Sequence, residues 1–367
     1  MAASATMKAL IFHGPYDVRL EDRPIPHVID PTDVVVKTTS AALCGSELHR
    51  YRGHSKINMQ PGYVCGHEGM GIVHEVGSEV RSFVKGDKVI APFTISCGEC
   101  FHCKRGITGR CVKCKSFGSV ALDGSQAQYF RVPLADSTLF HTPQEGDLGE
   151  LLILMTDIFP TGFNGARNAF RETPSDQWKD MTVVVIGCGP VALCSIICAL
   201  EYKPARIFAI DSVPDRLRRA KDLGCIPLNF KAVDVVKEVM RLTDGNGAHA
   251  VIEVVGLSPA LKTAYDIICP GGKISSVGVH NGELPFTAAD CYNKNIHIQF
   301  GRCPARYVFG EALQALIRNK DKIEKMRFID LVLPGLDDSC VDALRRFERA
   351  EVNKVVFKPN GIDAKSE

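Results

Sequence analysis

The spacing of apolar and polar residues changes near Pro160. Before that point, short runs rich in β-branched residues end at Gly, Pro or Asp, as strands joined by turns do. The clearest of these runs are 34–39, 71–77 and 87–93. After it, apolar strand-like runs alternate with helical stretches, in the order 181–187, a helix from Pro190, 205–211, a helix over 215–224, 248–256, a helix around 260–268, and 272–279. Repeated strand–helix units predict a parallel, doubly wound sheet.

The domain organisation follows from this change of pattern. A chain of 367 residues exceeds what one hydrophobic core usually supports, so two domains are expected. We predict an α/β fold, with a β-rich domain over residues 1–158 and an α/β domain over 159–302. The segment 303–367 contains one or two helices and a final strand at 354–359. We expect this segment to rejoin the first domain.

Composition narrows the possible partners and the compartment. The formal charge of +2 is spread over mixed-sign segments, which argues against nucleic acid or an acidic membrane as the main partner. The N-terminal MAASATMKAL lacks the pattern of a secretory signal, and the apolar stretch 191–200 is too short to span a bilayer. We therefore expect a cytoplasmic protein. Fifteen cysteines in such a chain favour a reducing compartment with thiolates on a metal over a disulfide framework.

A glycine-rich turn follows the first apolar strand of the α/β domain. Its pattern G-x-G-x-x-A falls on Gly187, Gly189 and Ala192, and Pro190 and Val191 open the following helix. Such a turn lets the backbone approach a pyrophosphate at a helix N-terminus, although a tight turn without a ligand would look the same.

An acidic residue supports the ligand-binding interpretation of this turn. Asp211 ends the next strand, where a carboxylate can accept hydrogen bonds from the adenosine ribose and repel a 2′-phosphate. A plain helix cap is the alternative role for Asp211. We predict NAD in preference to NADP, although Arg216 and Arg218, which lie close by in the sequence, favour NADP.

Four cysteines lie at the spacing C-x2-C-x2-C-x7-C: Cys97, Cys100, Cys103 and Cys111. Short spacings of this kind let four thiolates surround one Zn²⁺, which fills its coordination sphere and makes the site structural. Gly98, Gly106 and Gly109 would permit the necessary turns in a lobe over about 94–114. An iron–sulfur cluster is the chemical alternative. Cys114 is a fifth nearby thiol and is interpreted as a bystander.

A carboxylate stands in the apolar run LLILMTDIFPTG, residues 151–162. An unpaired buried carboxylate is costly, so Asp157 is expected to cap a helix, pair with a cation or bind a metal. Cys44 and the pair His67–Glu68 lie in two fragments further upstream. Each alone could be an ordinary core or surface residue.

Taken together, these motifs resemble the zinc-dependent medium-chain alcohol dehydrogenase family. The match runs in order through CGSELH at 44–49, GHE at 66–68, the four cysteines, the glycine-rich turn and the final strand. The resemblance implies a GroES-like catalytic domain and a Rossmann cofactor domain. It is closest to the type with a carboxylate as third zinc ligand, similar to the formaldehyde-dehydrogenase-like members.

Roles for individual residues are implied by the same resemblance. Cys44, His67 and Asp157 correspond to the ligands of a catalytic zinc, and Glu68 adjoins them and could approach the metal. Ser46 and His49 correspond to a proton relay, and Glu47 stands where the family commonly has Asp. The remaining positions are the nicotinamide contacts Thr161 and Val279, the pyrophosphate contact Lys354, the further cofactor contact Arg216, and Phe93 in the substrate pocket.

The resemblance implies hydride transfer between an alcohol and NAD, or in reverse from NADH to an aldehyde or ketone. Zinc would act as the Lewis acid, with a second, structural zinc in each subunit. The alternatives are a biosynthetic medium-chain reductase, an aldehyde dismutase and a non-catalytic NADH-binding sensor. A zinc-ribbon nucleic-acid binder is disfavoured because the chain has no basic face. We expect a small-molecule substrate and a homo-oligomer, a tetramer rather than a dimer.

Overall fold

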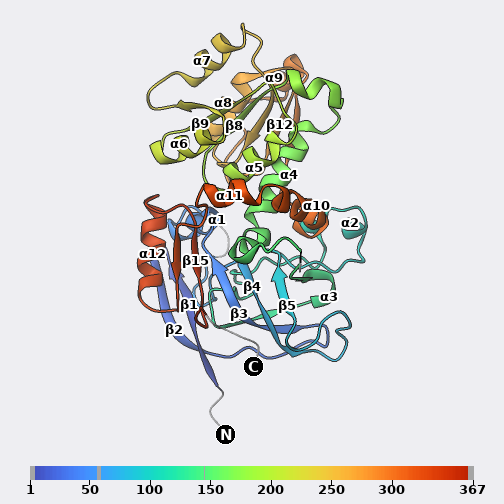
Figure 1. Ribbon diagram of the computed structural model, residues 1–367, viewed down its shortest axis with the longest axis vertical. Coiled ribbons are helices and arrows are strands. Elements are labelled where there is room, and N and C mark those ends of the chain that lie inside the picture. The colour runs from blue at the N-terminus through green and yellow to red at the C-terminus, as the bar shows by residue number, and fades with distance from the viewer. Residues whose placement is uncertain (1–4, 56–58, 144, 363–367) are drawn as a thin grey trace. The chain divides into compact units, whose positions relative to one another are not determined.

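The computed structural model describes residues 5–55, 59–143 and 145–362 (Figure 1). The chain divides into two compact units, one made of Met1–Asp157 with Pro304–Glu367 and the other of Ile158–Cys303. We call these the β-rich unit and the nucleotide unit. The extreme ends, 1–4 and 363–367, on which the interpretation of targeting partly rests, lie outside the described residues.

The β-rich unit is built on a sheet whose strand order is β14-β15-β3-β4-β5-β7, with β6 also paired to β3. Its strands are β3 (Val34–Ala42), β4 (Glu68–Val76), β5 (Lys88–Ala91), β6 (Tyr129–Val132), β7 (Phe140–His141), β14 (Leu331–Leu333) and β15 (Val355–Phe357). The late strand β15 runs antiparallel to the early strand β3, with Phe357 opposite Ala41. The C-terminal segment therefore completes a sheet that begins more than 300 residues earlier in the chain.

Short helices and a hairpin cover this sheet. The hairpin consists of β1 (Thr6–Gly14) and β2 (Asp17–Pro24). A core cluster joins Leu10 and Phe12 of β1 to Leu344 and Phe347 of α12 (Ser339–Glu348). The other helices are α1 (Gly45–Tyr51), α2 (Phe101–Lys104), η1 (Thr108–Arg110), α3 (Ala135–Thr138), η2 (Gly149–Thr156), α10 (Ala305–Arg318) and α11 (Lys320–Lys325).

The nucleotide unit contains a six-stranded parallel sheet of order β10-β9-β8-β11-β12-β13. Its strands are β8 (Thr182–Ile186), β9 (Arg206–Asp211), β10 (Ile226–Asn229), β11 (Ala248–Glu253), β12 (Ile268–Ser276) and β13 (His297–Phe300). Every residue of β8 is buried, as expected for a parallel strand with helices on both faces. The order of the strands reverses between β8 and β11, and ligands bind at such a point beside the carboxyl ends of the strands.

Helices connect these strands, as Figure 1 shows. The connecting helices are α5 (Pro190–Leu200), α6 (Pro214–Asp222), α7 (Val235–Leu242), α8 (Ser258–Ile267) and α9 (Ala288–Lys294). Two further helices, α4 (Ile158–Phe170) and η3 (Ser175–Asp180), precede β8. The doubly wound parallel sheet predicted from the alternating pattern is confirmed. No helix in the described part of the chain is both long and apolar enough to cross a bilayer.

Candidate functional site

Four side chains able to bind a metal meet inside the β-rich unit: Cys44, His67, Glu68 and Asp157. One possible ligand atom of each lies within 4.8 Å of every other, and all four residues are buried. Cys44 precedes α1, and Asp157 directly follows η2. Glu68 is the first residue of β4, and His67 directly precedes it. Three segments far apart in the sequence therefore converge on one point, which we call the Cys–His–Asp cluster.

The distances in this cluster are short enough for one shared cation. His67 Nε2 lies 3.1 Å from Asp157 Oδ2, and Cys44 Sγ lies 3.5 Å from the same oxygen. Burial raises the pKa of the Cys44 thiol, and the Asp157 carboxylate raises it further. Burial opposes the charged form of His67, but its contacts with Asp157 and Cys44 raise the pKa of the imidazole overall. A thiol, an imidazole and a carboxylate in this arrangement match the donor atoms that Zn²⁺ prefers.

Glu68 provides a second sign that a cation fits here. Its Oε1 atom is buried and has no hydrogen-bond partner among the described residues. Its Oε2 atom accepts a hydrogen bond from the ammonium of Lys354. Buried polar atoms are nearly always paired, so an unpaired carboxylate oxygen beside three metal-binding side chains fits a cation bound between them.

The position of Lys354 differs from the one expected from the sequence. We expected this side chain to contact the cofactor pyrophosphate. Instead it is completely buried within the β-rich unit, where its ammonium donates to Glu68 and, at 2.9 Å, to the carbonyl of Leu43. Burial opposes the charge on Lys354, but Glu68, together with the nearby Cys44 and Asp157, raises the pKa of the ammonium overall. A buried ammonium already held by a carboxylate is not available to a pyrophosphate, so Lys354 is reassigned to the surroundings of the cluster.

Glu47 lies directly behind the cluster. Its Oε2 atom accepts the backbone N–H of Cys44 at 3.0 Å, and its Oε1 atom lies 3.8 Å from His67 Nδ1. Gln126 donates to both carboxylate oxygens, at 3.2 and 3.3 Å. Carboxylates beside the outer nitrogen of a ligating imidazole orient the ring. Glu47 therefore reaches the place in which the family commonly has Asp, with Gln126 holding it there.

The two relay candidates occupy the same helix, α1. Ser46 Oγ lies 3.5 Å from Cys44 Sγ and 3.4 Å from His67 Nε2, so its hydroxyl adjoins the cluster. His49 is three residues further on, which places it on the same side of the helix one turn later. Burial, together with the nearby basic side chains, lowers the pKa of His49. Phe93 also adjoins the cluster, since its ring centroid lies 6.4 Å from that of His67.

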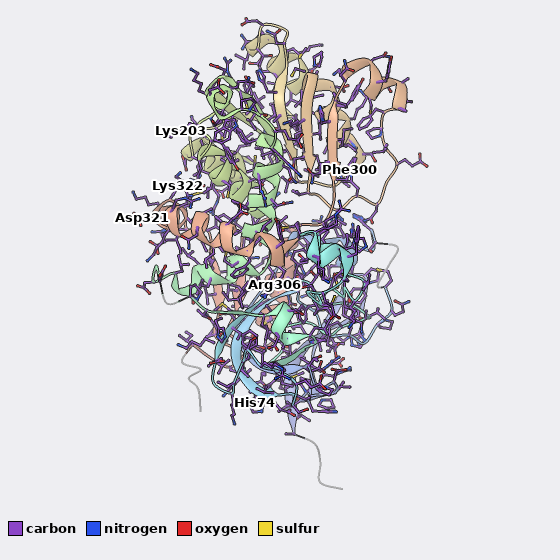
Figure 2. All side chains as sticks on the ribbon, turned by 90° about the vertical axis from the view of Figure 1, so that its right-hand side faces the viewer. His74, Lys203, Phe300, Arg306, Asp321 and Lys322 are labelled. Atoms are coloured by element: carbon purple, nitrogen blue, oxygen red, sulfur yellow. The ribbon has the colours of Figure 1, made fainter. Side chains whose placement is uncertain are left out.

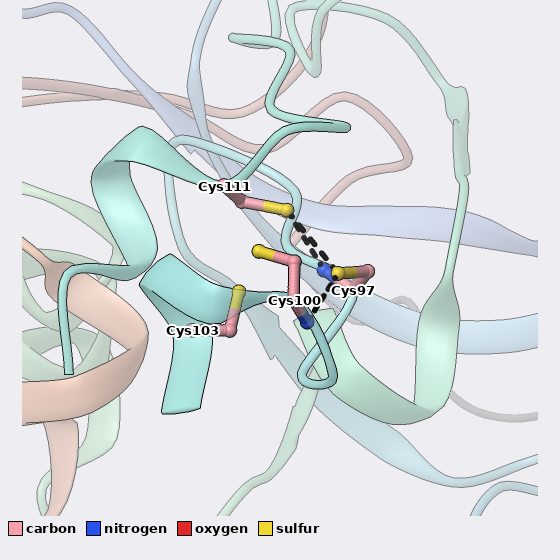
Figure 3. Close-up of side chains that lie close together, drawn as sticks. All are labelled: Cys97, Cys100, Cys103 and Cys111. Carbon is pink, nitrogen blue, oxygen red and sulfur yellow. Dashed lines mark hydrogen bonds between the residues drawn. The ribbon is translucent and has the colours of Figure 1, made fainter. Parts of the chain in front are cut away.

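The four cysteines of the lobe form a separate group in the same unit. The sulfurs of Cys97, Cys100, Cys103 and Cys111 all lie within 4.8 Å of one another (Figure 3). Backbone N–H groups point at these sulfurs, among them that of Cys97 toward Cys111 Sγ at 3.2 Å. Four convergent sulfurs with N–H donors are typical of a tetrahedral thiolate site for zinc. The fifth thiol, Cys114, instead contacts the carbonyl of Gly109 at 3.7 Å.

The glycines of this lobe behave in two ways. Gly98 and Gly106 have φ angles of +73° and +76°, in the left-handed region that favours glycine. Gly109 does not, because it lies inside the 3-10 helix η1. The expectation that all three glycines provide turns is therefore wrong for Gly109.

The glycine-rich turn of the nucleotide unit has the expected local geometry. Gly187, directly after β8, has φ +90°, and Gly189 precedes α5, whose first residue is Pro190. Asp211 Oδ2 accepts the N–H of Cys188 at 2.7 Å, which links the turn to the end of β9. The Arg216 guanidinium lies 3.9 Å from the same carboxylate oxygen.

Asp211 therefore also has a structural role. Its Oδ1 atom also accepts the N–H groups of Ser212 and Val213, at 2.6 and 2.9 Å. Thr161, buried in α4, and Val279, 52% exposed after β12, belong to the same nucleotide unit. The metal-binding candidates, by contrast, all belong to the β-rich unit.

The sequence did not predict the contacts of two groups of residues. Gln126, which holds Glu47, carries no local signal because it lies 79 residues away in the chain. Glu253 ends β11 as a buried acid and binds His280 and Ser276. A signal for Glu253 existed, since an acid at the end of an apolar strand is the pattern that singled out Asp211.

Known family models match segments of both units. Residues 30–144 match the family described as the alcohol dehydrogenase GroES-like domain. Residues 190–318 match the family described as zinc-binding dehydrogenase. The first match lies on the β-rich unit, and the second lies mainly on the nucleotide unit.

Individual relatives share most of the chain. Zinc-type alcohol dehydrogenase B of Aspergillus flavus is 50% identical over 360 residues, which cover 98% of this chain and 82% of that protein. The medium chain reductase/dehydrogenase ucsI of Acremonium sp is 52% identical over 288 residues, which cover 78% of this chain and 98% of that protein. Among solved structures, alcohol dehydrogenase TADH from Thermus sp. ATN1 superposes with a TM-score of 0.86 at 31% identity, covering 96% of this chain and 100% of that one.

Proposed function

Because the chain belongs to the zinc-dependent medium-chain alcohol dehydrogenase family, we propose that the Cys–His–Asp cluster is its catalytic zinc site. The protein is a zinc-dependent oxidoreductase of the alcohol dehydrogenase type. The observation that carries the assignment is the convergence of Cys44, His67 and Asp157, buried and with ligand atoms within 4.8 Å of one another. We assign the four-cysteine lobe to a second, structural zinc.

The charges of the proposed ligands favour a divalent cation. A thiolate and a carboxylate together offset the charge of Zn²⁺, and the neutral imidazole adds a third donor without adding charge. When bound, zinc supplies Lewis-acid chemistry, polarising the oxygen of an alcohol or a carbonyl. Glu68 keeps one carboxylate oxygen unpaired beside the ligands. We propose that Glu68 is able to approach the metal and that its ion pair with Lys354 holds it away.

The remaining residues would manage the substrate proton and the cofactor. The Ser46 hydroxyl, 3.4 Å from His67 Nε2, is placed to accept the proton of a substrate hydroxyl. His49 lies one turn along α1. Its neutral imidazole would accept that proton and then release it to solvent. We assign the dinucleotide to the turn at Gly187 and Gly189, as NAD. Phe93 would supply an apolar wall for a small alcohol or aldehyde.

Zinc content tests the ligand assignment directly. Asp157→Ala should reduce bound zinc from two ions per chain to one and abolish NAD-dependent alcohol oxidation, because only the catalytic site loses a ligand. Cys340→Ala is a matched control. Its thiol is buried in a hydrophobic core cluster of the same unit, donates to the carbonyl of Gly335 and belongs to neither candidate metal site, so this variant should keep both ions. An Asp157→Ala protein with two zinc ions and full turnover would show that Asp157 is not a ligand.

A second candidate function is supported by one relative. The Acremonium protein named a medium chain reductase/dehydrogenase shares 52% identity with this chain. The same site could therefore serve a biosynthetic reduction, or dismutate aldehydes. Product analysis after separate incubations with NAD and with NADH distinguishes the three reactions. A homotetramer stays the prediction for the oligomeric state, and light scattering on the purified protein would measure it.

A further inference from the structure

A buried carboxylate outside the metal sites has every acceptor position filled. Glu253, the last residue of β11, is completely buried. Its Oε1 atom accepts the backbone N–H groups of Val255 and Gly256, at 2.8 and 2.7 Å. Its Oε2 atom accepts the Ser276 hydroxyl at 2.7 Å and lies 2.9 Å from His280 Nε2. Four contacts match the four lone-pair sites of an ionised carboxylate.

These contacts also fix the chemical state of His280. Burial opposes the charge on Glu253, but the bonds from His280, Gly256 and Ser276 lower its pKa overall. An ionised carboxylate only accepts hydrogen bonds, so His280 Nε2 must carry the hydrogen that faces it. The same nitrogen lies 2.8 Å from Ser276 Oγ. His280 is therefore a donor that links the segment after β12 to the end of β11.

This group of residues lies beside the glycine-rich turn. A Cβ atom added to Gly187 would lie 2.9 Å from Val255 Cγ2, so the turn after β8 packs on the turn that Glu253 caps. The strand order reverses between β8 and β11, and a dinucleotide binds at such a reversal.

The turn capped by Glu253 also contacts the segment that carries Val279. A Cβ atom added to Gly256 would lie 2.5 Å from the carbonyl oxygen of Val279. No side chain could fit between these two backbones. The position of the turn at Gly256 therefore determines the position of the segment at Val279, the residue expected to contact the nicotinamide.

The ring of His280 is also held by an aromatic contact. The partner is Phe300 of the edge strand β13, which is labelled in Figure 2. The two rings meet edge-on, with centroids 5.6 Å apart and planes at 89°. The side chain remains 17% exposed. His280 is thus fixed from two sides while it still borders solvent.

We propose that His280 is a positioning residue for the nicotinamide half of the cofactor. Through Nε2 it holds the segment 277–280 against Glu253 and Ser276, so that this segment keeps its shape when the nicotinamide binds. The inference rests on the proposed function, because it assumes that the ligand is a nicotinamide dinucleotide. It assigns no contact between His280 and the adenosine half.

Two ligands that differ only in the nicotinamide test this proposal. In His280→Ala, the Kd for NADH, followed by its fluorescence, should rise about tenfold, the size expected for losing a hydrogen bond to a charged group. The Kd for ADP-ribose, which lacks the nicotinamide, should stay unchanged. His280→Gln, whose side-chain amide can donate to Glu253, should recover most of the NADH affinity.

His249, on the strand that ends at Glu253, provides a matched control. His249 near the start of β11 accepts the N–H of Thr182 at 3.0 Å, at the opposite end of the strand from Glu253. His249→Ala should leave both dissociation constants unchanged. If His280→Ala weakens NADH and ADP-ribose equally, or neither, the positioning role is overturned. If the wild-type protein binds neither ligand, the proposed function fails instead.

Discussion

The buried ion pair between Lys354 and Glu68 allows a quantitative prediction, because both side chains are completely inaccessible to solvent. Lys354→Met keeps the length and approximate volume of the side chain, so it should not open a cavity. It does remove the cationic partner of the Glu68 carboxylate. The other oxygen of that carboxylate has no hydrogen-bond partner among the described residues. In the chelator-treated protein, no other described side chain donates a hydrogen bond to the Glu68 carboxylate in place of Lys354.

The size of the effect follows from the burial. Removing one partner of a buried ion pair costs about 3–5 kcal/mol, because the remaining charge is left uncompensated. For a unit of roughly 220 residues, about 1 kcal/mol lowers Tm by roughly 2–4 °C. We therefore expect the melting temperature of the β-rich unit to fall by roughly 6–20 °C.

The effect should depend on pH. Burial raises the pKa of Glu68 to about 7, even with Lys354 opposing that rise. Removing Lys354 should raise it further. As the pH falls, the carboxyl takes up a proton and the unpaired charge disappears. The loss of stability should therefore be larger at high pH than at low pH.

Thermal unfolding followed by circular dichroism, on zinc-loaded and on chelator-treated protein, measures these effects. Lys354→Arg keeps the charge and should recover part of the stability. The double variant Glu68→Gln/Lys354→Met removes both charges and should recover most of it, because a neutral replacement for a buried ion pair is often tolerated. The reasoning is refuted if Lys354→Met melts within about 2 °C of the wild type. A double variant no more stable than Lys354→Met would contradict the coupling between the two residues.

Three further predictions concern the lobe, the relay and the glycine-rich turn. Cys111→Ser should release one zinc ion per chain, by atomic absorption, and lower Tm, because a structural zinc contributes directly to folding. Burial and nearby basic side chains lower the pKa of His49, so alcohol oxidation should fall only below the ordinary histidine range, as the imidazole gains a proton and stops accepting one. His49→Gln should remove that acidic limb and slow turnover roughly 100-fold in a pH–rate profile. Gly187→Ala should destabilise the nucleotide unit by about 1–3 kcal/mol in chemical denaturation, because φ is +90° and the new Cβ would lie 2.9 Å from Val255. Gly271→Ala, with φ +75° but open space around the new Cβ, should cost less.

The elements that the sequence predicted well are those with a local signal. The run 205–211 became β9, Arg206–Asp211, because its central residues 207–210 are apolar and buried, as in a parallel strand covered on both faces. The helix expected from Pro190 begins at that residue, since proline fits the first turn. Motif order was enough to select Cys44, His67 and Asp157, which the fold brings within 4.8 Å of one another.

The contacts that were missed join residues far apart in the chain. Lys354 and Glu68 are 286 positions apart, and neither carries a pattern that names the other. His280 and Glu253 lie on separate turns 27 residues apart, so only the register of β11 and β12 reveals the bond. Gly109 departs from the prediction for another reason, since a glycine two residues before a cysteine of the lobe can be helical as easily as left-handed.

The late pairing of β15 with β3 bears on how the polypeptide matures during translation. The nucleotide unit ends at Cys303, so its sheet can form while the last 64 residues are still being synthesised. The sheet of the β-rich unit must wait, because its strand β15 and the ammonium that pairs with Glu68 are synthesised after the nucleotide unit. A premature stop at or before codon 354 would therefore remove both β15 and the ammonium that pairs with Glu68, and would disturb the Cys–His–Asp cluster through a change far from it in the sequence.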